Sequence, residues 1–340
     1  MEGLQSSSPG FAEVRAAIAR IPRVRIALTP TPMEPAPNLG RHLGGPQIFV
    51  KRDDLTGVAM GGNKLRNLEF RLARAMAEKP DVVIVGLDLQ SNSARQTVGA
   101  CNKLGLETIL VLEGARPNQV QGNLLIDYLM GATVHFAATR QEQRARLDSL
   151  AEECRRQGKR PHILNDNPMF DVASAIAYLE TTMEIIDQLH AMQTRPTALY
   201  MSSSGKGQAG LELARKLFGG FAVQGVTATR EYEVAPRTAA IANETAKMLG
   251  LDVRLGSDDI TSCDRFVGAG YGTPSEAGNE AVRLFARTEG IVLDPVYTGK
   301  AAAGMIAHIR EGRFRKDEVV VFVHTGGAPA VFTWNTLWVD

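Results

Sequence analysis

The alternation of hydrophobic and polar stretches along the chain predicts an α/β protein. From residue 47 onward, short apolar runs rich in Val and Ile alternate with longer stretches whose apolar residues recur at helical spacing. This alternation is typical of βαβ units, in which helices cover both faces of a parallel sheet. We predict strands at residues 48–51, 82–85, 108–112, 133–136, 198–201, 222–226 and 319–323.

The stretches between these strands predict helices. They are residues 11–21, 65–78, 93–104, 122–130, 140–157, 171–189, 208–218, 236–249, 274–288 and 300–311. Apart from its single predicted helix, the segment 1–45 reads as irregular, because the Thr-Pro-Thr-Pro sequence at 29–32 and the prolines Pro35 and Pro37 favour an extended path. We expect this segment to wrap a core formed by later residues.

The length of 340 residues predicts two lobes, because single cores stop growing near about 250–300 residues. We predict an α/β fold with two open twisted sheets and a ligand in the cleft between them. The large domain is expected to be discontinuous, with residues 1–63 and 165–340, and the small domain to comprise residues 64–164. The run 161–168 has two prolines and three polar turn formers, so it is the expected crossover.

Composition narrows the possible functions. Hydrophobic residues make up 44% and charged residues 22% of the chain, with a formal net charge of +1, so neither nucleic acid nor an anionic membrane is an expected partner. No stretch has the apolar length of a membrane span or a signal peptide, which predicts a cytoplasmic protein. The three cysteines form no CxxC pair, and we expect neither disulfides nor a bound metal.

The first candidate cluster surrounds Lys64. The sequence Lys-Arg-Asp-Asp-Leu-Thr at 51–56 leads into a glycine-rich turn, and Gly61-Gly62-Asn63 precedes Lys64 where a helix is predicted to begin. Glycines allow close approach of the backbone to a ligand, and the lysine can reach into a cleft. A helix start is an unfavourable place for a cation, which points to a role beyond solvation. The alternative is a surface lysine in a first turn.

A second cluster, residues 90–96, follows the predicted strand 82–85 and opens a helix. Its hydroxyls, amides and free helix N–H groups suit a carboxylate ligand. The alternative is that Ser91 or Ser93 simply caps a helix that faces water. The candidate ligand-binding residues here are Ser91, Asn92, Ser93 and Gln96.

A third cluster, residues 202–210, again joins an apolar strand to a helix. Small residues there let successive N–H groups converge on a dianion such as a phosphate. The order of residues matches neither a Walker A loop nor G-x-G-x-x-G, and an ordinary turn is the alternative. The candidate residues are Ser203, Ser204, Gly205, Lys206, Gly207 and Gln208.

A fourth cluster lies near the end of the chain, at residues 270–274, 294–301 and 324–327. Two tyrosines with glycine neighbours can stack on a flat cofactor or move a proton, although a lone tyrosine is more often core filler. The candidate residues are Tyr271, Tyr297, Thr298 and Thr325.

Taken together and in this order, the clusters resemble the D-cysteine desulfhydrase and 1-aminocyclopropane-1-carboxylate (ACC) deaminase family. This family belongs to the tryptophan synthase β-like enzymes, which depend on pyridoxal 5'-phosphate (PLP). The resemblance covers nearly the whole chain and is most specific at residues 28–70, 90–96 and 294–301. It implies two open-sheet domains with PLP in the interdomain cleft, a small amino acid as substrate, and a homodimer.

The resemblance also implies a role for each cluster. Lys64 would hold PLP as a Schiff base and take the α-proton, and the 202–208 loop would bind the phosphate. Tyr297 would stack on or beside the pyridine ring, while Tyr271 would lie near the substrate, and either Tyr271 or Tyr297 would assist as a proton donor. The substrate carboxylate and the O3' side of the cofactor would be held by Ser91, Asn92 and Ser93, with Gln96 beside them.

Two positions bear on the reaction within this family. ACC deaminases carry Glu after the second tyrosine and Leu before the late Gly-Gly, whereas this chain has Thr298 and Thr325, as desulfhydrases and L-cysteate sulfo-lyases do. A threonine leaves the pyridine nitrogen largely neutral and the ring a milder electron sink, which suits loss of a good β leaving group. We therefore expect a PLP-dependent lyase that acts by β-elimination on a small amino acid such as D-cysteine or L-cysteate, giving a keto acid and ammonia.

Three departures from the family pattern leave the substrate open. Lys206 and Gly207 stand where Gly and Thr are expected, Ser93 replaces a His, and residues 165–170 replace a glycine-rich stretch. A side group bulkier than that of cysteine, or differently charged, fits these changes. Two further functions remain: an ACC-type deaminase, and a non-catalytic protein that binds PLP or an amino acid.

Overall fold

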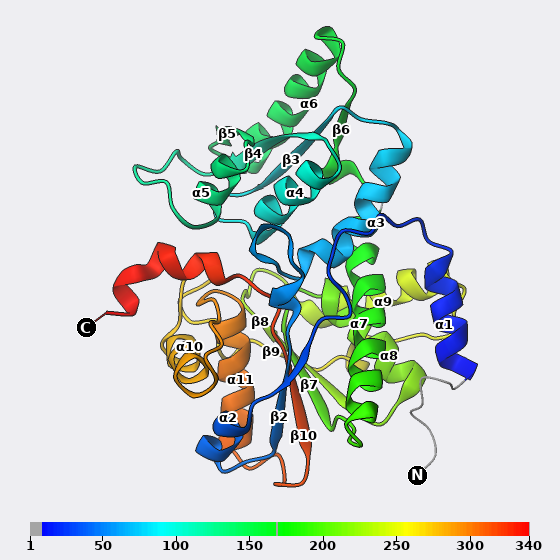
Figure 1. Ribbon diagram of the computed structural model, residues 1–340, viewed down its shortest axis with the longest axis vertical. Coiled ribbons are helices and arrows are strands. Elements are labelled where there is room, and N and C mark those ends of the chain that lie inside the picture. Colours follow the sequence, from blue (N-terminus) through cyan, green and yellow to red (C-terminus); the bar gives the residue numbers. More distant parts are fainter. Residues whose placement is uncertain (1–8, 168, 340) are drawn as a thin grey trace. The chain divides into compact units, whose positions relative to one another are not determined.

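The computed structural model describes residues 9–167 and 169–339 of the chain, which folds as two compact units (Figure 1). Unit 1 takes the chain up to Ile21, then Thr29–Leu55 and Ser174–Ala328. Unit 2 takes Pro22–Leu28, Thr56–Ala173 and the chain from Pro329 onward. Residues 1–8 of the predicted large domain and Pro168 of the predicted crossover lie outside the described residues.

The strands and helices alternate along the chain. The strands are β1 (Met33–Pro35), β2 (Gln47–Lys51), β3 (Val82–Asp88), β4 (Glu107–Glu113), β5 (Thr133–Ala137), β6 (Pro161–Ile163), β7 (Ala198–Ser203), β8 (Ala222–Thr227), β9 (Ser262–Cys263) and β10 (Val319–Val323). The helices are α1 (Pro9–Ala19), α2 (Pro37–Leu43), α3 (Lys64–Ala77), α4 (Asn92–Lys103), α5 (Gly122–Leu129), α6 (Arg140–Arg156), α7 (Val172–Ala191), α8 (Lys206–Phe218), α9 (Val234–Leu249), α10 (Glu276–Glu289) and α11 (Thr298–Arg310). Short 3₁₀ helices are η1 (Asp53–Leu55), η2 (Val58–Met60), η3 (Leu164–Asp166), η4 (Ser257–Asp259) and η5 (Ala328–Leu337).

Unit 1 is built on a six-stranded sheet in the order β1-β2-β10-β7-β8-β9. Strand β1 pairs antiparallel with β2, and the other described pairs are parallel. Helices α2, α10 and α11 pack together, with α11 against β7 and β8, while α8 contacts the same two strands and also α1 and α9. Strand β10 is buried at every position and reads as a continuous run of Val and Phe, as expected for a strand covered on both faces.

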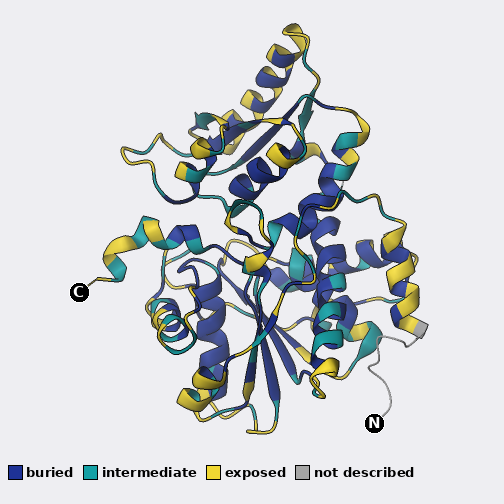
Figure 2. Cartoon of the chain, viewed as in Figure 1, coloured by how far each residue is buried: buried dark blue, intermediate teal, exposed yellow. Residues whose placement is uncertain are grey.

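Unit 2 is built on a parallel four-stranded sheet in the order β5-β4-β3-β6. Side chains alternate between its faces, so Val83 and Val85 of β3 join the core beneath α3 and α4, whereas Val82 and Ile84 join the core beneath α6. Figure 2 shows both strands and inward helix faces as buried. The continuous apolar run that predicted a strand therefore reflects burial on two faces.

The predicted elements are confirmed in type, with ends that shift by up to three residues. Three short strands, β1, β6 and β9, were not predicted because each has only two or three residues. The expected extended path at Pro37 is wrong: this proline occupies the start of α2, where its missing N–H needs no acceptor.

The division between the units differs from the predicted division at residues 63/64 and 164/165. The segment Pro22–Leu28 joins unit 2 because Glu69 of α3 accepts hydrogen bonds from the N–H groups of Ile26 (2.6 Å) and Ala27 (2.7 Å). The run 161–168 is not the crossover, since β6 pairs with β3 inside unit 2. The chain instead passes from unit 2 to unit 1 between Ala173 and Ser174, within α7.

Candidate active site

Lys64 is the first residue of α3 and follows a tightly folded turn in unit 2. The Thr56 side chain closes this turn, because its hydroxyl oxygen accepts from the Gly62 N–H and donates to the Gly62 carbonyl, both at 2.8 Å. A Cβ on Gly62 would lie 2.4 Å from the Gln96 amide, so the glycine is required for this close approach. The turn thus fixes the backbone from which the partly buried Lys64 side chain starts.

The cluster at residues 90–96, which is predicted to bind a carboxylate ligand, lies at the N-terminus of α4, just after the end of β3. Ser91 caps the helix, because its hydroxyl oxygen accepts from the N–H groups of Ser93 (3.1 Å) and Ala94 (3.3 Å). Ser91, Asn92 and Ser93 are all partly exposed. Capping and ligand binding are compatible here, since the cap leaves the hydroxyl hydrogen of Ser91 available to a ligand.

Gln96 is fully buried and faces the turn before Lys64. Its side-chain oxygen accepts from the Leu65 N–H (3.0 Å), and its nitrogen donates to the Asn92 carbonyl (3.0 Å). Gln96 therefore joins the start of α3 to the start of α4. A contact between Gln96 and the substrate remains a prediction. The two hydrogen bonds of its side chain stabilise the start of α3, where Lys64 lies.

In unit 1 the candidate loops follow neighbouring strands. Strands β10 and β7 pair in parallel with Val323 opposite Met201, so the segments after them leave the same edge of the sheet. One of these segments is the 202–208 loop and the other contains Thr325. The carboxyl edge of a parallel sheet is where α/β proteins bind ligands.

The 202–208 loop enters α8 through Gly205, whose φ of 96° suits glycine. The first-turn N–H groups of α8, from Lys206 to Gln208, have no intrahelical acceptor by helix geometry and favour an anion. The Ser203 hydroxyl donates to the Gln208 side chain (2.6 Å) and accepts from the Gly205 N–H (3.1 Å). Ser204 is exposed at the tip of the loop.

One departure from the family pattern, Gly207, has a packing explanation. A Cβ on Gly207 would lie 2.9 Å from Met201 and 3.1 Å from Tyr178, so the helix packs too closely there for the expected Thr. The Gln208 side chain is buried and donates to Glu212 (3.2 Å) and to the Thr261 carbonyl (2.9 Å). The predicted contact of Gln208 with phosphate therefore depends on its backbone N–H.

Tyr271 and Tyr297 lie together in unit 1. Their hydroxyl oxygens are 2.6 Å apart, within hydrogen-bond distance, and their rings meet edge to face at 6.1 Å between centroids. The Lys300 ammonium donates to the Gly270 carbonyl (3.0 Å) and so holds the loop that carries Tyr271. Burial lowers the pKa of Lys300 to about 8, against the opposing effect of Asp294. The two predicted catalytic tyrosines thus form one hydrogen-bonded pair.

Asp294 organises the start of α11, where Tyr297 and Thr298 lie. Its buried carboxylate accepts from the N–H groups of Val296 (2.9 Å), Tyr297 (2.7 Å) and Thr298 (2.8 Å), and from the Thr298 hydroxyl (2.6 Å). A Cβ on Gly327 would come within 2.8 Å of the same carboxylate. Asp294 therefore shapes the start of α11 and lies close to Gly327 of the segment 324–327, a role the sequence pattern did not reveal.

The Thr325 segment is held by the preceding residue, His324. Its imidazole is buried, with Nε2 3.1 Å from the Val292 carbonyl and Nδ1 accepting from the Gly326 N–H at 3.4 Å. Burial lowers the pKa of His324, which keeps the ring neutral. A neutral ring with Nε2 protonated matches both contacts.

The third departure, residues 165–170, also contributes to the framework of unit 2. The Asn165 side chain accepts from the Gly86 N–H (2.7 Å) and donates to the Gly86 carbonyl (3.0 Å), which extends the edge of the sheet beyond β6. Asn167 donates to the Arg71 carbonyl (2.9 Å) and accepts from the Met169 N–H (2.8 Å). These hydrogen bonds give the two asparagines of the run a structural role in unit 2.

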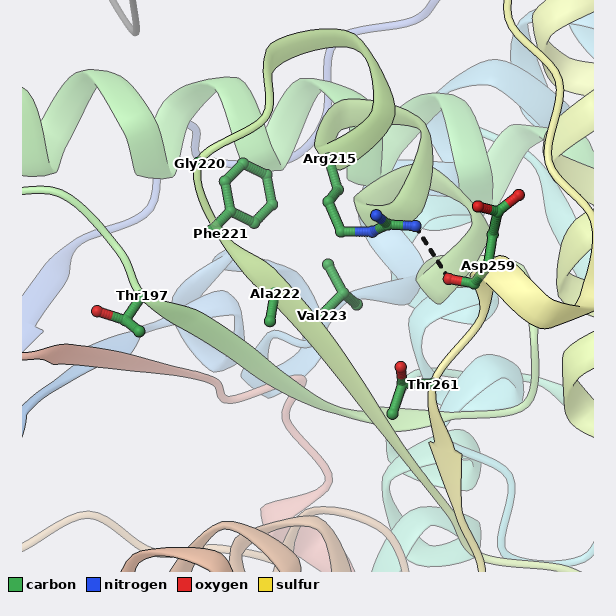
Figure 3. A pocket seen from close by; sticks show the side chains of 8 residues that line it. All are labelled: Thr197, Arg215, Gly220, Phe221, Ala222, Val223, Asp259 and Thr261. Atoms are coloured by element: carbon green, nitrogen blue, oxygen red, sulfur yellow. Dashed lines mark hydrogen bonds between the residues drawn. The ribbon is translucent and has the colours of Figure 1, made fainter. Parts of the chain in front are cut away.

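A surface pocket of about 420 Å³ lies elsewhere in unit 1, lined by Thr197, Arg215, Gly220, Phe221, Ala222, Val223, Asp259 and Thr261 (Figure 3). Thr197 and Ala222 stand at the amino ends of β7 and β8, whereas the 202–208 loop leaves the carboxyl end of β7. The pocket is therefore separate from the candidate residues of this unit.

Residues 9–167 and 169–339 contain no group of three or more His, Cys, Asp or Glu side chains placed to hold a metal ion. Within the same ranges, none of the helices combines the length and apolar character needed to cross a bilayer.

The arrangement of a lysine at a glycine turn, a helix N-terminus after β7 and a tyrosine pair agrees with comparisons to known proteins. The family model described as pyridoxal-phosphate dependent enzyme matches residues 24–326. The chain belongs to this family. It is an enzyme that depends on PLP, and the resemblance inferred from its motifs is confirmed.

The similar proteins include several lyases. A D-cysteine desulfhydrase of Klebsiella pneumoniae (strain 342) is 39% identical over 325 residues, covering 94% of this chain and 98% of the relative. A D-cysteine desulfhydrase of Salmonella typhi is 37% identical and also covers 94% of this chain and 98% of the relative. The crystal structure of an ACC deaminase homologue aligns with a TM-score of 0.82 at 31% identity, covering 96% of this chain and 98% of that one.

A hydrogen sulfide-producing enzyme from Fusobacterium nucleatum aligns with a TM-score of 0.59 at 15% identity, covering 92% of this chain and 96% of that one, and this likeness bears on the fold alone. With the ACC deaminase homologue, it confirms the predicted α/β fold of the tryptophan synthase β-like enzymes.

The residues present suit the parts of PLP. The N-terminus of α8, opened by Gly205 in a left-handed conformation, offers converging N–H groups to a phosphate dianion. Lys64 offers an amine at the end of a turn that admits no larger residue at Gly62. Taken separately, each of these two groups has the chemistry that one part of PLP requires.

Proposed function

We propose that the enzyme eliminates the β substituent of a small amino acid and that D-cysteine is its preferred substrate. The products would be pyruvate, sulfide and ammonia; L-cysteate would give sulfite in place of sulfide. The observation that carries this proposal is the near full-length similarity to D-cysteine desulfhydrases, 37–39% identical over 94% of this chain.

Two residues support elimination rather than ring opening. Thr298 and Thr325 stand where the resemblance places Glu and Leu in ACC deaminases. The carboxylate of Asp294 is engaged by the backbone of α11 and by Thr298 itself, so it is not a substitute for that Glu. Without a carboxylate partner, the pyridine nitrogen stays largely neutral, which suits departure of a thiolate or sulfite.

Bound PLP supplies the electron sink that stabilises negative charge at the α-carbon. The Lys64 amine takes the α-proton, for which it must be neutral. The Ser91 hydroxyl and the first N–H groups of α4 hold the substrate carboxylate. The Tyr271 hydroxyl gives a proton to the leaving sulfur, and the Tyr297 hydroxyl, 2.6 Å away, hydrogen-bonds to the Tyr271 oxygen that remains.

The test is a panel of amino acids mixed with the purified enzyme, in which keto acid, ammonia and sulfur product are all measured. The panel contains D-cysteine, L-cysteine, L-cysteate and ACC. We expect D-cysteine to give pyruvate and sulfide in equal amounts. Release of no keto acid from any thiol or sulfonate substrate would contradict the proposal.

The variant Lys64→Ala should lose at least about 10³-fold in kcat, because both the covalent anchor and the base are removed. Borohydride reduction followed by mass spectrometry should find the cofactor on the peptide that contains Lys64 in the wild type. The exposed Lys316 offers a matched control, since Lys316→Ala should keep full activity and labelling. Labelling that persists in Lys64→Ala would assign the anchor to another lysine.

An ACC-type deaminase is the second candidate, favoured by the structural likeness to an ACC deaminase homologue. ACC would then give 2-oxobutanoate and ammonia in the same panel. If ACC gives 2-oxobutanoate faster than D-cysteine gives pyruvate at equal substrate concentrations, ACC deamination becomes the first candidate function.

We also propose that the enzyme acts as a cytoplasmic homodimer, as the resemblance to its family suggests. Sedimentation of the purified protein tests the dimer, because its mass should be twice the 36.7 kDa of the chain. Fractionation of cells that express it tests the location. A monomer of full activity, or activity found in the membrane fraction, would contradict these two points.

A further inference from the structure

The turn before Lys64 has an unfavourable backbone conformation. Positive φ values occur at Gly57 (100°), Ala59 (51°), Met60 (61°), Gly61 (66°) and Gly62 (123°). Residues other than glycine, such as Ala59 and Met60, rarely adopt backbone angles in the left-handed region. Contacts from residues outside the turn must therefore stabilise it.

The main contact comes from Arg95 on α4, a side chain with no exposed surface. Its guanidinium donates to the carbonyl oxygens of Ala59 and Gly61, the latter at 3.0 Å. Close packing supports these bonds, since a Cβ on Gly99, one turn later on α4, would lie 2.7 Å from the Ala59 side chain. The turn is thus pressed onto α4 with Arg95 bonded to two of its carbonyls.

Through Asn123, the same guanidinium is also linked to the cluster at residues 90–96, which is predicted to bind the substrate carboxylate. Its Nε donates to the Asn123 side-chain oxygen (2.7 Å), and Asn123 Nδ2 donates to Asn92 Oδ1 (3.0 Å) and to the Gln90 carbonyl (2.8 Å). Both arms of this network lie within unit 2. One buried cation therefore connects the backbone that carries Lys64 with Asn92, one of the residues that the resemblance assigns to the substrate carboxylate and the O3' side of the cofactor.

We propose that Arg95 is a positioning residue that sets the place of Lys64 relative to Asn92 without touching substrate or cofactor. The inference deepens the proposed function and rests on it. A planar guanidinium suits this task because it presents several donors in fixed directions, two of which serve the turn and one Asn123. A lysine at position 95 would present a single ammonium and could not keep all three bonds in the same geometry.

A purely structural account of Arg95 has to be separated from this one. Asp127 on α5 is also buried, and among the described residues neither of its carboxylate oxygens has a hydrogen-bond partner. The charge of Arg95 favours ionisation of Asp127, so removing Arg95 alone would also disturb this carboxyl. The double variant Arg95→Met/Asp127→Asn removes both charges and leaves only the lost positioning.

The experiment compares the wild type, Arg95→Lys, the double variant and the single variant Asp127→Asn, with the exposed Arg155→Met as matched control. Three quantities are measured: the rate at which PLP combines with apoenzyme, the pH midpoint of the visible absorbance of the lysine-bound cofactor, and kcat for D-cysteine. Urea denaturation reports which variants are folded.

We expect the folded double variant to bind PLP more slowly, to shift the pH midpoint of its absorbance and to lose about 10- to 100-fold in kcat, because small misplacements of a reacting group carry large rate effects. Arg95→Lys should lie between the double variant and the wild type, whereas Asp127→Asn and Arg155→Met should resemble the wild type. If the double variant is folded and matches Asp127→Asn in all three quantities, Arg95 only balances charge and the proposal is overturned.

The first two quantities use PLP and the protein alone. They therefore test Arg95 even if D-cysteine is not the substrate, and the substrate panel tests the proposed function separately. Should the double variant fail to fold, the same comparison is read from Arg95→Lys, whose wild-type values in all three quantities would overturn the proposal.

Discussion

In unit 2 the candidate residues are held by a buried guanidinium and buried amides, whereas in unit 1 they are held by a carboxylate and a neutral imidazole. Arg95, Gln96 and Asn123 bond mainly to the carbonyls and N–H groups of a strained turn and a helix start. Asp294 and His324 bond to the backbone around two segments at the carboxyl edge of a sheet.

The difference follows from what precedes each segment. In unit 1 the 202–208 loop and the Thr325 segment leave strands β7 and β10, whose pairing already fixes where these segments start. The turn before Lys64 contains η2 and does not leave a strand directly, and its left-handed residues need side-chain bonds from the next helix. Unit 2 should therefore be sensitive to the loss of a buried cation, and unit 1 to the loss of a buried anion.

The largest of the expected effects on stability concerns Asp294. Asp294→Ala removes the acceptor of three N–H groups and one hydroxyl in a buried position, which should lower the free energy of unfolding by about 3 kcal/mol. Urea denaturation measures this change. The exposed Asp252→Ala is the matched control and should be neutral.

Asp294→Asn keeps one acceptor oxygen and should recover part of the loss caused by Asp294→Ala. An unchanged midpoint for both variants would mean that the start of α11 is set by the sheet alone. The expectation that unit 1 is sensitive to the loss of a buried anion would then be wrong.

A change of comparable size is expected from pH, through Asp127 of unit 2. Burial raises the pKa of this carboxyl to about 7, so between about pH 4 and 7 the folded protein binds more protons than the unfolded chain. The free energy of unfolding should therefore fall by about 2–4 kcal/mol as the pH rises through this window.

Asp127→Asn should flatten this decline, which denaturation at pH 4.5 and at pH 8 can measure, taking about 3.9 as the unfolded pKa. The exposed Asp148→Asn serves as control and should leave the pH dependence unchanged. A wild-type slope that survives in Asp127→Asn would assign the effect to another group.

The smallest effect is expected at the tyrosine pair. Tyr271→Phe removes one partner of the 2.6 Å hydroxyl contact at a side chain that is 42% exposed, so stability should change by less than about 0.5 kcal/mol. Loss of its proton transfer should nevertheless lower kcat about tenfold or more, with little change in KM.

Steady-state kinetics with D-cysteine checks the tyrosine prediction. Tyr128→Phe, on an exposed position of α5, is the matched control and should behave as the wild type. Should Tyr297→Phe, but not Tyr271→Phe, lower kcat, the donor would be Tyr297 and the assignment within the pair would be reversed.

Sequence patterns predicted the longer elements well, because burial on both faces leaves a continuous apolar run such as β10 and amphipathic spacing leaves a helix such as α4. They failed where elements are short, as at β6, or where a proline begins a helix, as at α2. The motifs also made Lys64, Ser91 and the tyrosines candidates, since these residue types stand out at glycine turns and helix starts; their roles remain predictions.

Sequence alone determined the family, the cofactor and the chemical groups at the candidate site, because those depend on local motifs that the chain preserves in order. Tertiary structure decided what each polar residue contacts. The sequence predicts Gln96 and Gln208 as ligand-binding residues, whereas in the structure their buried side chains form hydrogen bonds with protein groups. Arg95 and Asp294 drew no prediction of their own, since hydrogen-bond partners far apart in sequence are set by packing and strand order, which local patterns do not encode.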